Sequence, residues 1–141
     1  MSSVACCFDW SQSGTVAVAF EDGSVQLFSK ISKFSSKSLS SHGGRITCLR
    51  WSKNSKWLIL GGNNTITIWD IRNESRRQLD SSTIPGLNGP GYDLLWKNNK
   101  IFVWHTKRNK IFVADLAING LLAVEVSLVS KNPFFFIIFV K

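Results

Sequence analysis

Several features that mark secreted, membrane-spanning or disulfide-bonded proteins are missing from this chain. Its three cysteines, two of them adjacent at Cys6 and Cys7, do not make a disulfide framework, which favours a reducing compartment. The N-terminus MSSVACCFDW lacks the basic start and apolar stretch of a signal peptide. The apolar run FFFIIFV at 134–140 is far shorter than the ~20 residues that a spanning helix needs. We therefore expect an intracellular protein, nuclear or cytoplasmic, that does not associate with membranes.

Sequence signatures of catalysis and of bound groups are also absent. No Cys-x-x-Cys or His-Glu-x-x-His spacing is present, so no metal site is predicted. The stretch GLNGPG at 86–91 lacks the Lys-Ser/Thr and the helix of a phosphate-binding loop. Gly-x-Ser-x-Gly is missing, and no Ser, His and acid are spaced like a catalytic triad. The chain is predicted not to be an enzyme and to use no cofactor.

Charge is distributed unevenly along the chain. Residues 1–28 hold Asp9, Glu21 and Asp22 but no Lys or Arg, whereas the other 113 residues carry 17 bases and six acids. Clustered basic charge attracts polyanions such as nucleic acids. Because no run of bases exceeds two residues and TKRNK at 106–110 is the densest cluster, a solvated surface is favoured over a nucleic-acid groove.

A repeat of a little over 40 residues organises the sequence. Tryptophans 41 and 45 residues apart begin the pattern: Trp10, Trp51 and Trp96. Eighteen residues after each comes the end of a short apolar strand: Phe28, Trp69 and Ala114. Cys7 and Cys48 share one position, three residues before a tryptophan, and are interpreted as packed small apolar residues rather than ligands.

Each copy reads as a series of strands separated by polar turns. In ITCLRW, alternation places Thr47, Leu49 and Trp51 on one face, and Ile46 with Cys48 on the other. Turns such as EDGS carry the Asp-Gly signal of a tight hairpin. Four antiparallel strands recurring at this period predict an all-β chain of about three four-stranded propeller blades, at about 4–40, 41–85 and 86–125.

The middle copy resembles the WD-repeat (β-transducin) family. His42, Ile46, Leu49 and Trp51 match the family's leading positions, and the pair Trp69-Asp70 matches its closing Trp-Asp. The resemblance spans residues 4–117. It implies WD-type blades of a β-propeller.

In that family a His, a Ser or Thr, an Asp and the Trp form a hydrogen-bonded tetrad. The resemblance implies a partial tetrad here, since His42 and Trp69 match, Asn63 replaces the turn Asp, and no clear Ser or Thr stands on the second strand. The first copy keeps Asp22 at its turn, and the third keeps Asp115 but has Arg108 at its turn. We expect these residues and Asp70 to be structural.

Three blades do not close a propeller, because rings hold roughly four to eight. We expect residues 1–117 to be a partial propeller that needs further blades or self-association. The tail at 118–141 is atypical and is interpreted as truncation or read-through into unrelated sequence. Its apolar, β-prone composition is an aggregation hazard.

Two classes of function remain open. The first, which the resemblance implies, is a protein-binding scaffold, with contact candidates at turns and strand ends: Arg45, Trp104, His105, Lys107 and Arg108. GSVQLFSKISK and YDLLWKNNKIFV also resemble the propeller of transducin-β-like corepressor subunits, which assemble with histone deacetylases in the nucleus, while WD-repeat scaffolds in Mediator and in ciliary transport share the same repeat pattern. The second is a basic nucleic-acid-binding module, and a truncated product without function is a further alternative.

Overall fold

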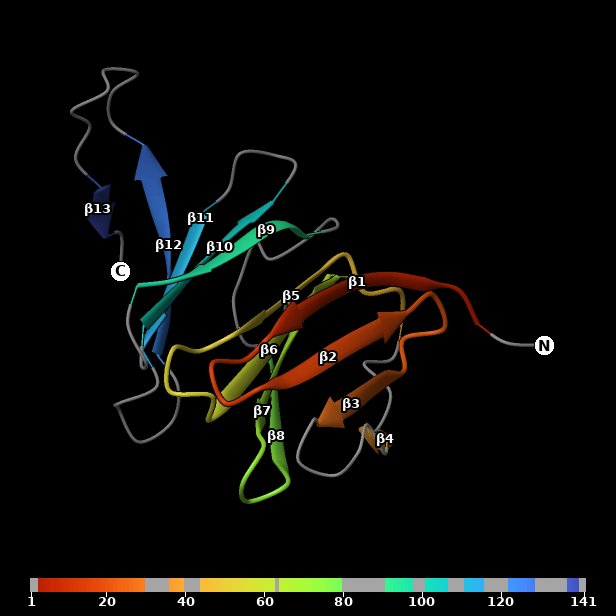
Figure 1. The fold of residues 1–141 in the computed structure, drawn as a ribbon. Helices are drawn as coiled ribbons and strands as arrows, with labels where there is room; N and C mark the ends of the chain where they lie inside the picture. Colours follow the sequence, from red (N-terminus) through yellow and green to blue (C-terminus); the bar gives the residue numbers. More distant parts are fainter. Residues whose placement is uncertain are drawn as a thin grey trace.

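Three antiparallel sheets follow one another along the chain, as the computed structural model shows for residues 3–29, 36–39, 44–62, 64–79, 91–97, 101–106, 111–115, 122–128 and 137–139 (Figure 1). The first sheet holds β1 (Ala5–Trp10), β2 (Thr15–Phe20), β3 (Val25–Ser29) and β4 (Ser36–Leu39). The second holds β5 (Cys48–Trp51), β6 (Trp57–Gly62), β7 (Thr65–Asp70) and β8 (Ser75–Leu79). The described residues contain no helix, so the predicted all-β fold is confirmed.

The third sheet has one strand more than the other two. It holds β9 (Gly91–Trp96), β10 (Ile101–Thr106), β11 (Ile111–Asp115), β12 (Leu122–Leu128) and β13 (Ile137–Phe139), in that spatial order. The last two strands lie within the stretch at 118–141 that is predicted to be an atypical tail. That stretch therefore supplies the fourth strand of the third sheet and pairs a fifth strand with it at Val126↔Phe139.

Equivalent turns close the first hairpin of the first two sheets in the same way. Ser11 and Ser52 directly follow the repeat tryptophans and are buried. The Ser11 hydroxyl accepts a hydrogen bond from the Thr15 amide at 3.0 Å, and the Ser52 hydroxyl accepts one from the Trp57 amide at 2.9 Å. A short polar side chain that bonds nearby backbone is typical of turns. The repeat seen in the sequence is thus a repeat of turn chemistry as well.

The middle sheet is buried on both faces, which explains its continuous apolar run WLIL. Leu58 and Leu60 pack toward the first sheet, whereas Ile59 between them packs toward the third. Strands covered on both faces read as unbroken apolar runs rather than as alternation. Fully burying a leucine or isoleucine contributes roughly 1.5–3 kcal/mol, so this sheet anchors both neighbours.

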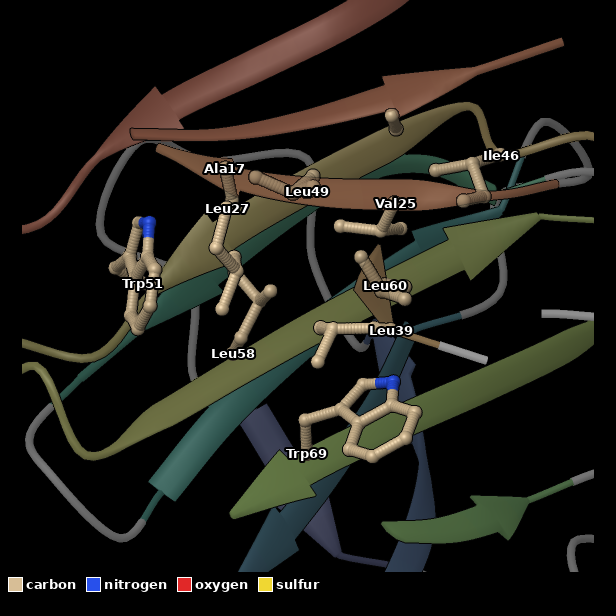
Figure 2. Packing of buried hydrophobic residues seen from close by; sticks show 11 residues of the cluster. Ala17, Val25, Leu27, Leu39, Ile46, Leu49, Trp51, Leu58, Leu60 and Trp69 are labelled. Atoms are coloured by element: carbon tan, nitrogen blue, oxygen red, sulfur yellow. The ribbon is translucent and has the colours of Figure 1, made fainter. Parts of the chain in front are cut away.

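Two hydrophobic clusters join the three sheets. The cluster between the first and second sheets is drawn in Figure 2, where side chains of both sheets meet: Ala17, Val25, Leu27, Leu39, Leu49, Leu58, Leu60 and Trp69. The cluster between the second and third sheets contains Cys48, Ile59, Ile66, Ile68, Leu79, Leu94 and Ala114. Ile46 lies in the first cluster, together with Leu49 and Trp51, although alternation assigned it to the opposite face. The alternation fails there because β5 begins only at Cys48.

Tryptophans on the innermost strands connect successive sheets by one repeated hydrogen bond. Trp51 on β5 donates its indole Nε1–H to the backbone oxygen of Asp9 on β1 at 3.0 Å. Trp96 on β9 donates its indole Nε1–H to the backbone oxygen of Arg50 on β5 at 3.3 Å. In each case the acceptor is the residue just before the tryptophan of the preceding sheet. We call this the interblade tryptophan contact.

Trp69 offers a comparison, because its buried indole nitrogen has no hydrogen-bond partner among the described residues. Replacing Trp51 by Phe removes a hydrogen bond and leaves the Asp9 oxygen unpaired, whereas replacing Trp69 by Phe removes an unsatisfied donor. We expect Trp51→Phe to lower the free energy of unfolding by at least about 1 kcal/mol more than Trp69→Phe. Urea unfolding followed by far-ultraviolet circular dichroism measures both. Equal losses, or a larger loss for Trp69→Phe, would contradict this account.

Candidate functional site

The strand directions bring turns from different blades to two opposite rims. One rim, called here the Arg45 rim, contains residues 21–24, 44–47 and the end of β6 at Gly61 and Gly62. The other, called the Lys53 rim, contains the turns 11–14, 52–56 and 71–74. Hydrogen bonds join blades at both rims, from Cys6 Sγ to the Ile46 oxygen at 3.2 Å and from the Ser13 amide to Ser55 Oγ at 3.1 Å.

Arg45 lies exposed at the rim named for it, as its sequence position suggests. Its Nη2 is 4.0 Å from Glu21 Oε1 on the turn of the first blade, and 70% of its side chain is accessible. An exposed ion pair of this kind contributes only about 0–1 kcal/mol. The guanidinium can therefore exchange Glu21 for an external carboxylate at little cost.

Gly62 allows the backbone of Arg45 to reach this place. At Gly62 φ is +151°, and a Cβ built there would lie 2.3 Å from the Arg45 carbonyl oxygen. The adjacent Gly61 oxygen accepts hydrogen bonds from the Thr47 amide at 2.8 Å and from Thr47 Oγ1 at 3.1 Å. The glycine pair thus holds the entry to β5 against the end of β6.

Asp22 stabilises the neighbouring turn of the same rim. Its Oδ1 accepts hydrogen bonds from the Ser24 amide at 2.9 Å and the Ser24 hydroxyl at 2.6 Å, and Gly23 takes φ +86°. These bonds favour the charged form and lower the pKa of the Asp22 carboxyl below its usual range. The tight hairpin predicted from EDGS is confirmed.

The other residues of the predicted tetrad have different surroundings. Asp70 is buried and holds the turn after β7, since it accepts hydrogen bonds from the Asn73 amide and from Asn73 Nδ2 at 3.2 and 2.9 Å. Trp69 is buried with its Nε1 unpaired among the described residues, in line with the missing Ser or Thr. Asp115 is half-buried at the end of β11. His42 and Asn63 lie outside the described residues, so the tetrad itself stays a prediction.

The remaining contact candidates fall on the third sheet. Trp104 and His105 lie near the end of β10, where the backbone register pairs them with Leu94 and Asp93 of β9. Lys107 and Arg108 lie outside the described residues. β10 follows β9 in its sheet as β6 follows β5, so the end of β10 corresponds to the end of β6 at Gly62.

A second basic rim was not singled out by sequence reasoning. The exposed Lys53, Lys56 and Arg72 come from two turns of the middle blade, which the hydrogen bond from the Ile71 amide to the Lys56 oxygen joins at 3.1 Å. Asn54, Ser55 and these turns line a shallow hollow. Glu74 on the same rim is paired with Lys37, whose ammonium lowers the pKa of the Glu74 carboxyl. The sequence signal that could have predicted this rim is the position of the turns 52–56 and 71–74, which lie at the same end of the middle sheet.

The free cysteines lie near one another, since Cys6 and Cys48 both act on the Cys7 thiol. Cys48 is buried in the cluster between the second and third sheets, and Cys7 packs against the other cluster, as predicted. No group of three or more metal-binding side chains occurs among the described residues. Over the same residues, no helix is long and apolar enough to cross a membrane.

Comparison with known proteins agrees with this geometry. A family model for the WD domain, G-beta repeat, matches residues 33–70, the stretch that contains β5, β6 and β7. The middle blade resembles a WD repeat. The WD-repeat resemblance predicted from the sequence is confirmed, and the three sheets correspond to blades of a WD40 β-propeller.

Relatives and solved structures share this repeat and fold. Human F-box-like/WD repeat-containing protein TBL1Y and mouse (Mus musculus) TBL1X are each 29% identical over 96 residues, which cover 67% of this chain and 17% of theirs. The β-propeller domain of Myceliophteria thermophila Cps50 (Swd1) superposes with a TM-score of 0.75 at 18% identity, over 92% of this chain and 41% of that one. The RRP9 WD40 repeats superpose with a TM-score of 0.72 at 15% identity, and the superposition covers 91% of this chain and 46% of that one. The chain thus spans less than half of these structures and about a sixth of the curated relatives.

Replacing Gly62 tests how Arg45 is positioned. A Gly14→Ala variant meets no atom within 4 Å at φ +89°, so it carries only the left-handed backbone cost of about 1–2 kcal/mol. Gly62→Ala adds the clash with the Arg45 oxygen, and we expect a further loss of about 1–3 kcal/mol. Urea unfolding of both variants measures the difference. A Gly62→Ala loss no larger than that of the Gly14→Ala control would contradict the close approach.

Because the Cys7 thiol is buried, we expect the free energy of unfolding to fall as the pH rises into the alkaline range. Burial first, and then the neighbouring Cys6, raises the pKa of Cys7 from 9.0 to about 12. Below pH 9.0 the thiol is protonated in both states and adds no pH dependence, whereas between 9.0 and about 12 only the unfolded chain releases the proton. We expect Cys7→Ala to remove part of the stability decline in this window. An unchanged slope in urea unfolding across the window would disprove it.

Proposed function

We propose that this WD-repeat chain is a non-catalytic scaffold for protein–protein interaction. The observation that carries the proposal is the middle blade, buried on both faces, with exposed turns at both of its ends. A stiff frame that presents side chains at strand ends is suited to binding a partner with little loss of conformational entropy. The finer part of the proposal is a nuclear corepressor or chromatin complex, supported by the similarity to TBL1X and TBL1Y.

The Arg45 rim is the proposed contact surface. Arg45 is exposed, its only described ionic partner is a loosely held Glu21, and its place depends on Gly62. The end of β10 belongs to the corresponding rim of its own sheet, so Trp104, His105, Lys107 and Arg108 are proposed to extend the contact. Arginine and tryptophan dominate binding hot spots, and a partner segment with a carboxylate would replace Glu21.

Affinity capture from nuclear extract with the full chain tests this surface. We expect proteins that stay bound in high salt after nuclease treatment, among them histone deacetylase complex subunits, and at least a tenfold or so loss for Arg45→Glu. Lys53→Glu makes the same charge change on the opposite rim and serves as the control. Recovery that is equal for wild type and Arg45→Glu, or lost only in Lys53→Glu, would rule out the Arg45 rim.

The Lys53 rim favours a second candidate, which is nucleic-acid binding. Lys53, Lys56 and Arg72 are exposed there, and the Lys56 ammonium lies 4.9 Å from the centre of the Trp57 ring, an arrangement of base beside aromatic. Phosphate contacts make affinity fall steeply with salt. In the same capture experiment, retention that ends with nuclease or high salt and fails in Lys53→Glu would favour this function over the scaffold.

A further inference from the structure

The outer face of the first sheet is apolar and exposed. Phe8 is 63% accessible and Trp10 is 54% accessible. The register places Val18 opposite Phe8 and Val16 opposite Trp10, so these side chains share one face, and Phe28 lies opposite Val16 on that face. The other face of the sheet, with Ala17 and Leu27, is covered by the second sheet. We call the exposed side the Trp10 face.

The interblade tryptophan contact indicates what this face fits. Trp51 and Trp96 each pack on the preceding sheet and donate Nε1–H to a backbone oxygen there. Trp10 occupies the equivalent position in its own sheet, yet among the described residues it makes no such bond and over half of it is exposed. Tryptophan placed at an edge in this way can bury a large apolar area while its N–H finds one acceptor. The Trp10 face is therefore equipped for one more interblade contact.

The opposite end of the chain carries the complementary half of that contact. The acceptors in the two existing contacts are Asp9 and Arg50, each just before a repeat tryptophan. The equivalent residue in the third sheet is Leu95, just before Trp96, and its side chain is 61% exposed. Its neighbour Leu94 points the other way and is buried against the second sheet. Leu95 thus marks an open face, called here the Leu95 face, on the last sheet.

We propose that the Trp10 face docks on the Leu95 face of a second copy of this chain, with Trp10 Nε1 donating to the backbone oxygen of Leu95 in that copy. Both halves of a contact that already occurs twice within the chain are open at its two ends. Two copies joined head to tail at both ends would place six blades in a ring, within the roughly four to eight that propellers use. Closure by two equal contacts is the symmetric arrangement expected of a dimer.

Charge supports this choice of occupant. Residues 1–29, which contain β1 to β3, hold three acids and no base. Residues 86–117, which include β9 to β11, hold five bases and two acids. The fourth strand of the first sheet adds Lys37, so the opposite charge is confined to β1–β3 of one copy and the segment with β9–β11 of another, where it favours their encounter.

Light scattering after size-exclusion chromatography of the full chain tests the proposal. We expect a dimer at twice the 15.8 kDa chain mass. Trp10→Arg and Leu95→Arg each place a charge on one face, and each should convert the dimer to a monomer with unchanged far-ultraviolet circular dichroism. Arg72→Glu, an exposed change at the Lys53 rim and away from both faces, is the control and should leave the dimer intact.

Mixing the two monomeric variants distinguishes head-to-tail docking from other dimers. The Trp10→Arg chain retains its Leu95 face and the Leu95→Arg chain retains its Trp10 face, so the mixture should form a heterodimer through one intact contact. Neither variant forms a dimer alone, because each lacks one half.

Three results would overturn the proposal: a monomeric wild-type chain, a dimer that survives either face variant, or a mixture that stays monomeric. The experiment contains no binding partner, so its failure leaves the scaffold function untouched, and failure of partner capture leaves the dimer untouched.

Discussion

Burial of the middle blade between its two neighbours is the constraint on which the rest of the structure depends. Leu58 and Leu60 serve one interface, and Ile59 serves the other, within three consecutive residues of a single strand. Neither flanking sheet has this property among its described residues, since Phe8 and Trp10 of the first are exposed, and Leu95 of the third is exposed as well. The stability of both outer blades is therefore expected to come largely from the middle one.

The interblade tryptophan contact adds direction to this packing. A hydrophobic face alone would tolerate many offsets, but an indole N–H that must meet one backbone oxygen sets how far each blade is displaced along its neighbour. The Trp51 indole meets the backbone oxygen of Asp9, and the Asp9 carboxylate also accepts a hydrogen bond from the Trp51 amide at 2.8 Å. The turns that begin just after the repeat tryptophans are thereby brought together, as the bond between Ser13 and Ser55 shows. Rim geometry thus follows from a contact made in the core.

Some polar side chains of the turns stabilise their own turn, whereas others are exposed and could contact a partner. Asp22 and Asp70 each accept hydrogen bonds from their own turn, Asp22 from Ser24 and Asp70 from Asn73. Arg45 is different, because its one described ionic partner is exposed and 4.0 Å away. The basic side chains of the Lys53 rim are also exposed at turns. Partner binding is thus best sought where side chains are held by the backbone and not by other side chains.

Periodicity in the sequence determined the blades, because strand length, turn chemistry and the recurrence of Trp10, Trp51 and Trp96 are local properties that need no knowledge of distant contacts. The resemblance of the middle blade to a WD repeat and the tight Asp22 turn were predictable for the same reason. Only the tertiary structure decided which face each apolar residue covers, as the position of Ile46 shows, and whether a tryptophan finds an acceptor or, like Trp10, does not. It also decided that β12 and β13 extend the third sheet, since nothing in their own residues specifies which strand they pair with. Packing and pairing depend on what the rest of the chain places opposite a residue, and that is the information a single stretch of sequence does not carry.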